Sequence, residues 1–162
     1  MIDIRPATAD DLPRIEQIYD AVHTAEETGA ASVALDDGAL FVLEDDGVLV
    51  AAGRIDQVQV PVYAQVPWQY AAPPEQVLVL HTLVVDPTIA GHGYGTQFVR
   101  FYARRARALS GTVLRIDTNA ANTRARRLYA RLGFREAAIV PCTFNGIAGV
   151  ELVCLEKRLD AE

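Results

Sequence analysis

The chain has 162 residues and a formal net charge of −6, and 51% of its residues are hydrophobic. This length suits one domain with a sizeable core, and the apolar fraction excludes a disordered chain. The acidic balance disfavours DNA or RNA as a partner, because nucleic-acid binders usually carry a basic excess. No apolar run approaches the ~20 residues of a membrane span, so we expect no contact with a membrane.

Location and metal content can also be predicted from composition. The N-terminal residues lack a basic segment followed by an apolar one, so we expect no signal peptide and a cytoplasmic protein. Two cysteines, Cys142 and Cys154, are too few for a disulfide framework and are expected to be reduced core residues. The three histidines, His23, His81 and His92, lie far apart, and no Cys/His spacing is typical of zinc, so we expect no metal.

The first part of the chain predicts a strand, a helix and a hairpin. Residues 2–5 alternate as in a strand, and residues 8–11 resemble a capping box at the start of a helix. Apolar residues then recur at helical spacing over residues 12–22. Residues 39–44 and 48–58 predict two strands, and an Asp-Asp-Gly sequence between them is a hairpin signal.

Residues 61–75 are rich in proline and aromatic residues. Four prolines exclude a regular central strand or helix there. Loops on a scaffold often carry specificity, and aromatic rings supply apolar binding area. Trp68 and Tyr70 are therefore candidate substrate-binding residues, with the equally weighted alternative that Trp68 covers the core from outside.

The centre of the chain predicts a strand, a glycine turn and a helix. Residues 77–85 are apolar, and Asp86-Pro87 ends this strand. Glycines follow at positions 91, 93 and 95, immediately before a helical pattern. The predicted buried stripe of that helix is Phe98, Val99, Tyr102, Ala106 and Leu109. Because the first turn of a helix has unpaired N–H groups that glycines leave accessible, we expect a phosphorylated ligand at residues 91–96.

The glycine spacing disagrees with the two commonest phosphate-binding motifs. A dinucleotide fingerprint G-x-G-x-x-G would need glycine at Thr96 or Phe98, and a P-loop would need a lysine that is absent here. A glycine turn without any ligand remains an alternative, because G-x-G-x-G is a weak signal alone.

The last part of the chain predicts a strand, a helix and a closing hairpin. Residues 111–118 form the strand, and Asn122 is the predicted N-cap of a helix that stops at Gly133. Residues 134–143 and 149–159 predict two strands joined by an Asn-Gly turn. The mixed element order favours an α/β (α+β) domain of three layers with a mixed sheet over a doubly wound parallel sheet.

Two motifs resemble those of the GNAT N-acetyltransferase superfamily. Residues 85–95 are similar to V-x-P-x-x-R/Q-x-x-G-x-G/A, and residues 122–134 match N-x-x-A-x-x-L-Y-x-x-x-G-F throughout. One departure is Ala90, where the family usually has Arg or Gln. Backbone N–H groups would still bind the phosphate, and His92 or Arg124 are candidates to supply charge.

The resemblance implies a single GNAT domain over residues 1–162, with a mostly antiparallel sheet of six or seven strands that is flanked by helices and splayed at its central strands. It implies acetyl-CoA as cosubstrate, without a metal, and a primary amine of a small molecule, amino acid or peptide N-terminus as acceptor. Homodimers are common in the family. The residues implied to bind coenzyme A are Leu83, Val84, Val85, Gly91, His92, Gly93, Tyr94, Gly95, Thr96 and Asn122.

The resemblance also implies catalytic roles. Tyr129 matches the family tyrosine that protonates the coenzyme A thiolate, although a core aromatic residue is the alternative. His81 lies where some members place a general base, a task that its neutral form suits; Glu75 or Glu151 are alternatives, and the Val84 N–H is the expected oxyanion donor. A second hypothesis is a non-catalytic acyl-CoA-binding or regulatory domain, which needs neither His81 nor Tyr129.

Overall fold

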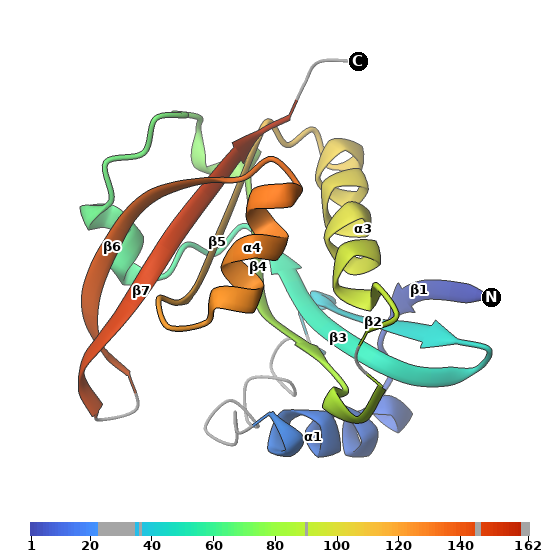
Figure 1. The fold of residues 1–162 in the computed structure, drawn as a ribbon. Helices are drawn as coiled ribbons and strands as arrows, with labels where there is room; N and C mark the ends of the chain where they lie inside the picture. The colour runs from blue at the N-terminus through green and yellow to red at the C-terminus, as the bar shows by residue number, and fades with distance from the viewer. Residues whose placement is uncertain (23–34, 36, 90, 145–146, 160–162) are drawn as a thin grey trace. The chain divides into compact units, whose positions relative to one another are not determined.

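The computed structural model describes the chain except for residues 23–34, 36, 90, 145–146 and 160–162. The strands are β1 (Ile2–Pro6), β2 (Leu40–Asp45), β3 (Val48–Asp56), β4 (Val77–Val85), β5 (Val113–Asn119), β6 (Arg135–Phe144) and β7 (Ile147–Arg158). The helices are α1 (Leu12–Ala21), α3 (Tyr94–Ala108) and α4 (Thr123–Arg131) (Figure 1). The predicted order of strands and helices is confirmed for the residues that the structure describes.

The strands form a mixed sheet with the order β1-β2-β3-β4-β5-β7-β6. The pairs β1/β2, β2/β3, β5/β7 and β6/β7 are antiparallel, as expected for a mostly antiparallel sheet. The chain divides into two compact units, which contain residues 1–56 with 80–102, and residues 57–79 with 103–162.

The first unit has three layers, with β2 and β3 between α1 and α3. Side chains alternate across a strand, so Leu40 and Val42 pack against α1, whereas Phe41 contacts Phe101 of α3 at a ring-centroid distance of 5.3 Å. The residues that α1 buries are Ile15, Ile18 and Tyr19. This unit therefore has a core on each face of its sheet.

Helix α3 approaches β3 closely at Gly53. A Cβ atom at Gly53 would lie 2.7 Å from Cε1 of Phe98, so only glycine leaves room for the ring. The predicted stripe of α3 is buried at its first four positions. The prediction was wrong at Leu109, which follows the end of the helix and is 43% exposed.

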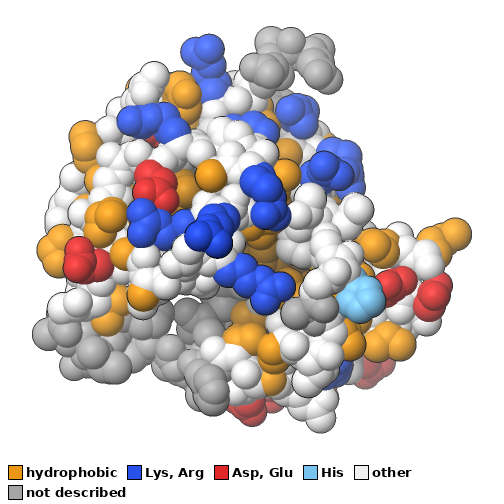
Figure 2. Space-filling view, viewed as in Figure 1, with side chains coloured by type: hydrophobic (Ala, Val, Ile, Leu, Met, Phe, Trp, Pro, Cys, Tyr) orange, Lys and Arg blue, Asp and Glu red, His pale blue; other side chains and the backbone are white. Residues whose placement is uncertain are grey.

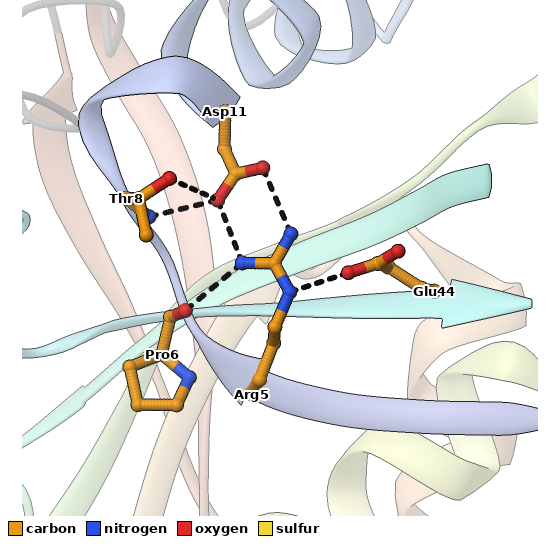
Figure 3. A network of polar contacts seen from close by, with 5 residues as sticks. All are labelled: Arg5, Pro6, Thr8, Asp11 and Glu44. Atoms are coloured by element: carbon orange, nitrogen blue, oxygen red, sulfur yellow. Dashed lines mark hydrogen bonds and ion pairs between the residues drawn. The ribbon is translucent and has the colours of Figure 1, made fainter. Parts of the chain in front are cut away.

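A network around Arg5 connects β1 to the start of α1 and to β2 (Figure 3). The Nη1 and Nη2 atoms of Arg5 donate to both Asp11 carboxylate oxygens at 2.8 and 3.0 Å, and Nε contacts Glu44. The Asp11 carboxylate also accepts the Thr8 N–H at 2.7 Å, which confirms the predicted capping box. The Arg5 hydrogen bonds lower the pKa of Asp11 to about 2.

In the second unit, the proline-rich segment (residues 57–76) packs on one face of β5 and β7. It contains short 3-10 turns at Pro61–Gln65 and Pro74–Gln76 and no strand, as its prolines predict. Its Tyr63 and Val66 pack with Val113 of β5 and Cys154 of β7 in an apolar cluster. The segment is therefore part of the folded core of this unit.

The closing strands β6 and β7 form the expected antiparallel hairpin, with Phe144 opposite Ile147. The predicted Asn145-Gly146 turn lies outside the described residues. The single domain and the splay between central strands stay predictions. In the part of the chain that the structure describes, no helix is long and apolar enough to cross a membrane.

Candidate active site

The glycine turn lies between β4 and α3 in the first unit. Gly91 and Gly93 have φ values of 92° and 74°, and a Cβ atom at either position would meet nothing within 4 Å. Glycine is therefore required by the backbone conformation and not by crowding. The Gly93 carbonyl accepts the Gln97 N–H at 3.0 Å, which makes Gly93 the N-cap of α3. The N–H groups of the following turn have no acceptor within the helix, as the phosphate site requires.

A buried aspartate fixes the start of this turn. The Asp86 carboxylate accepts the Thr88 N–H at 2.9 Å, the Thr88 hydroxyl at 2.7 Å and Nη2 of Arg14 at 2.6 Å. The Arg14 hydrogen bond is the main cause that lowers the pKa of Asp86. The backbone N–H of Asp86 also donates to the Val50 carbonyl at 2.8 Å, so the chain leaves the sheet at a defined point. Ala90, the departure from the family motif, lies outside the described residues.

The side chain of Tyr94 connects the first turn of α3 to the end of β2. Its hydroxyl donates to Oδ2 of Asp45 at 2.6 Å, which raises the pKa of Tyr94 and lowers that of Asp45. The exposed His92 ring stacks on Tyr94 with 5.4 Å between ring centroids. Gly95 and Thr96 follow in the helix and are half-buried. His92 thus lies beside the predicted phosphate site.

Strand β4 changes faces at Thr82, which has a φ of 55°. Residues four apart in a regular strand share a face, yet Leu80 lies against Gly53 on the α3 side and Val84 packs in the cluster with α1. A positive φ is an outlier for a β-branched residue. Such an irregularity redirects the backbone groups of the next residues, which are Leu83 to Val85, the predicted contacts for the pantetheine arm.

His81 immediately precedes this irregularity and is paired with an aspartate. Nε2 of His81 lies 2.9 Å from Oδ1 of Asp56, and the two side chains are 13% and 16% exposed. The other carboxylate oxygen, Oδ2, accepts Nε of Arg54 at 2.5 Å. Our sequence reasoning missed Asp56 and Thr82. Asp56 is 25 residues from His81 in the sequence, and no local pattern indicates that pairing.

Tyr129 belongs to the second unit and is held by the end of α4. The Phe134 N–H donates to the Tyr129 carbonyl and the Gly133 N–H to the Ala130 carbonyl, with Gly133 at a φ of 91°. This is a Schellman motif, and it confirms the predicted stop. Its usual apolar contact is here the pair of Tyr129 and Phe134, with ring centroids 5.8 Å apart. Burial, followed by the charge of Asp117, raises the pKa of Tyr129 to about 12.

Asn122 caps α4, as predicted. Its side-chain oxygen accepts the Ala125 N–H at 3.1 Å, and the residue is exposed. A role toward coenzyme A stays a prediction. Figure 2 shows Lys and Arg side chains gathered on the face that carries α4. On α4, Arg126 forms a two-point contact with Glu136 at 2.7 and 2.8 Å, whereas Arg124 is exposed.

Trp68 and Tyr70 have structural contacts in the second unit. Nε1 of Trp68 donates to the Tyr63 carbonyl at 3.0 Å, and the Arg115 guanidinium lies 4.3 Å from the Trp68 ring centroid. The Tyr70 N–H donates to Glu156, and its carbonyl accepts Nη2 of Arg115 at 3.1 Å. These contacts agree with the alternative in which Trp68 covers the core, and substrate binding by either residue stays a prediction.

The candidate residues are therefore divided between the two units. The first unit contains His81, residues 83–85 and the glycine turn. The second holds Asn122 and Tyr129 on α4, with Trp68 and Tyr70 in the proline-rich segment. The alternative bases, Glu75 and Glu151, are exposed residues of the second unit.

Solved structures of similar fold come from several bacteria. An acetyltransferase of the GNAT family from Streptococcus agalactiae is 16% identical with a TM-score of 0.80, and the match covers 99% of this chain and 96% of that one. A ribosomal-protein-alanine N-acetyltransferase from Brucella melitensis is 22% identical with a TM-score of 0.74, covering 97% and 99%. An acetyltransferase from Salmonella typhimurium, solved with its cofactor acetyl-CoA, is 19% identical with a TM-score of 0.72, covering 99% and 95%.

These identities are low, so the structural neighbours establish the fold alone. Among curated proteins, none matches the sequence significantly. The family model of the acetyltransferase (GNAT) family matches residues 4–134, which is most of the chain and includes the glycine turn, Asn122 and Tyr129. The chain therefore belongs to the GNAT acetyltransferase family.

Proposed function

We propose that this protein is an acetyl-CoA-dependent N-acetyltransferase that transfers the acetyl group directly to a primary amine. The observation that carries the proposal is the glycine turn, in which Gly91 and Gly93 are exposed, adopt positive φ and lie immediately before the first N–H groups of α3. A single domain of residues 1–162, a cytoplasmic location and no resident metal complete the proposal.

The donor set of the glycine turn suits a pyrophosphate. Backbone N–H groups at a helix N-terminus bind anions through hydrogen bonds and the helix dipole. The turn at residues 91–96 would hold the pyrophosphate, residues 83–85 the pantetheine arm, and Asn122 the arm or the backbone beside it. When bound, acetyl-CoA supplies an acetyl thioester, an activated acyl group. The Salmonella neighbour contains acetyl-CoA, which supports this assignment.

His81 is the proposed general base. A primary amine has a pKa of about 10 and is mostly protonated at neutral pH, so it must lose a proton before it can attack a carbonyl. A neutral imidazole accepts a proton readily in this pH range. The largely buried position of His81, next to the irregular residue Thr82, supports His81 over the exposed Glu75 and Glu151.

Tyr129 is the proposed group that stabilises the departing thiolate. With a pKa of about 12, its phenol remains protonated at neutral pH and can donate a hydrogen bond to the negative sulfur. The Val84 N–H is the proposed oxyanion donor. Direct transfer is supported by Cys154, because burial raises the pKa of its thiol to about 12 and leaves little reactive thiolate.

The first test is the substitution Tyr129→Phe, which removes the donor and keeps the ring. We expect turnover to fall about 100-fold or more while coenzyme A affinity stays unchanged. Release of free thiol from acetyl-CoA would be followed over a panel of amines, amino acids and peptides, including one that begins with alanine. Tyr102→Phe is the matched control, since Tyr102 is also a buried tyrosine but lies outside the proposed site.

A non-catalytic acyl-CoA-binding domain makes the opposite prediction. It would bind coenzyme A at the glycine turn but release no thiol with any acceptor. Under that alternative there is no turnover to lower, so the only property that Tyr129→Phe or His81→Gln can change is the affinity for coenzyme A.

A further inference from the structure

We propose that Asp56 is a positioning residue that holds His81 in one tautomer, with the proton on Nε2 and the lone pair on Nδ1. Nδ1 is then the atom that takes the proton from the acceptor amine. This inference rests on the proposed function for the role of His81 as a base, but the tautomer itself can be measured without catalysis.

The geometry around Asp56 determines which nitrogen carries the proton. Nε2 of His81 and Oδ1 of Asp56 are 2.9 Å apart, and an ionised carboxylate can only accept. Nε2 of neutral His81 must therefore be the donor, which leaves the lone pair on Nδ1. Because both side chains are mostly buried, water competes little for this hydrogen bond.

Arg54 orients the Asp56 carboxylate. Arg54 and Asp56 are two residues apart on β3, so their side chains lie on the same face of the strand. Nε of Arg54 donates to Oδ2 of Asp56 at 2.5 Å. Asp56 thus has one oxygen bound to a permanent cation and the other directed at the imidazole.

In the proposed transfer, the proton passes from the ammonium group of the acceptor to His81. An N–H bond of the ammonium group breaks, its electron pair stays on the amine nitrogen, and the proton forms a bond to Nδ1. The imidazolium that results is stabilised by the negative charge of Asp56 and then releases the proton to solvent.

Arg54 makes the substitution Asp56→Asn informative. An amide has a single acceptor oxygen, and Arg54 has only donors, so the oxygen should turn to Arg54 and the NH₂ group to His81. Nε2 of His81 must then accept, and its proton moves to Nδ1. The variant keeps the shape of the site but blocks the nitrogen that the amine needs.

The tautomer can be read from long-range ¹H–¹⁵N spectra of the histidine rings above neutral pH. The chain has three histidines, so His23→Gln and His92→Gln variants are enough to assign His81. We expect the Nε2–H tautomer in the wild-type protein and the Nδ1–H tautomer in Asp56→Asn. Asp3→Asn, which changes an exposed aspartate on β1, is the matched control and should leave the spectrum unchanged.

Kinetics give the second readout. We expect Asp56→Asn to lower kcat about 100-fold or more while the KM for acetyl-CoA stays within about twofold, because the cofactor contacts are unchanged. An Nδ1–H tautomer in the wild-type protein, or wild-type kcat in Asp56→Asn, would overturn the inference. If the wild-type protein acetylates no amine, the proposed function fails, and the wild-type spectrum alone still decides the tautomer.

Discussion

The glycine turn in the first unit and the proline-rich segment in the second are both irregular, yet they are stabilised by different means. In the glycine turn, positive φ values at Gly91 and Gly93 define the path, with one carboxylate, Asp86, at its start. In the proline-rich segment, buried side chains of β5 and β7 determine the path. Glu156 accepts the N–H groups of Gln69 and Tyr70 at 2.9 and 2.8 Å.

This difference has a functional meaning. A turn defined by its own backbone keeps its N–H groups accessible to a ligand, as a phosphate site requires. A segment held by buried polar side chains has already used its hydrogen-bonding groups within the fold. We therefore expect substitutions of the buried polar residues that hold the proline-rich segment to change stability strongly, and substitutions of the glycines in the glycine turn to change ligand binding more than stability.

The largest effect should follow removal of Glu156. This side chain is fully buried and also accepts Nη1 of Arg135 at 2.5 Å. Glu156→Ala would leave two backbone N–H groups and a guanidinium without their acceptor, so we expect the free energy of unfolding to fall by about 3 kcal/mol. The free energy of unfolding can be measured by urea unfolding, followed through the fluorescence of Trp68, the only tryptophan of the chain. Glu156→Gln keeps one acceptor oxygen and should lose less; an equal loss in both variants would contradict the assignment to hydrogen bonds.

The features that could be predicted from the sequence depend on neighbouring residues. The Asn122 cap, the Gly133 stop and the break at Asp86-Pro87 each need only a few consecutive residues to satisfy backbone groups. The element order followed from the same kind of signal. The prediction that Leu109 is buried was wrong because the helical spacing of apolar residues continues by one position beyond the residue where α3 ends.

The features that could not be predicted depend on residues that are distant in the sequence, or require a backbone conformation that the residue type disfavours. The pairing of His81 with Asp56 joins two strands, and the burial of Glu156 under the proline-rich segment joins residues 87 positions apart. Thr82 adopts a positive φ that threonine disfavours, so the residue type predicts a different backbone conformation at this position. In this chain the proposed base and its partner belong to that second class.

An intermediate effect is expected at Asp86, the carboxylate at the start of the glycine turn. Asp86→Ala removes acceptors for Thr88 and Arg14, which should lower the free energy of unfolding by about 2 kcal/mol at pH 7. Since the folded pKa of Asp86 is lowered, its stabilisation is fully present above the unfolded value of about 3.9 and is lost as the pH falls through the folded value.

The difference between the wild-type protein and Asp86→Ala should therefore shrink as acid is added below about pH 4. Thermal unfolding at a series of pH values measures this difference. Asp86→Asn is the matched control, because it can keep the Thr88 N–H bond while it loses the charge that Arg14 needs. A difference that stays constant down to pH 2 would show that the carboxylate charge has no part in stabilising the turn.

The smallest effect on stability should come from Gly93. Alanine at a φ of 74° is strained but meets no atom, so Gly93→Ala should cost about 1 kcal/mol of unfolding free energy. Asn tolerates this conformation better, so Gly93→Asn should cost less. Both variants place a side chain where the pyrophosphate is proposed to lie, and both should weaken coenzyme A binding more than they weaken folding.

Calorimetric titration with coenzyme A, beside urea unfolding of the same samples, separates the effect on binding from the effect on stability. Unchanged affinity in both variants would show that the accessible backbone of the glycine turn does not bind coenzyme A. The glycine turn and the proline-rich segment would then differ only in how their residues pack.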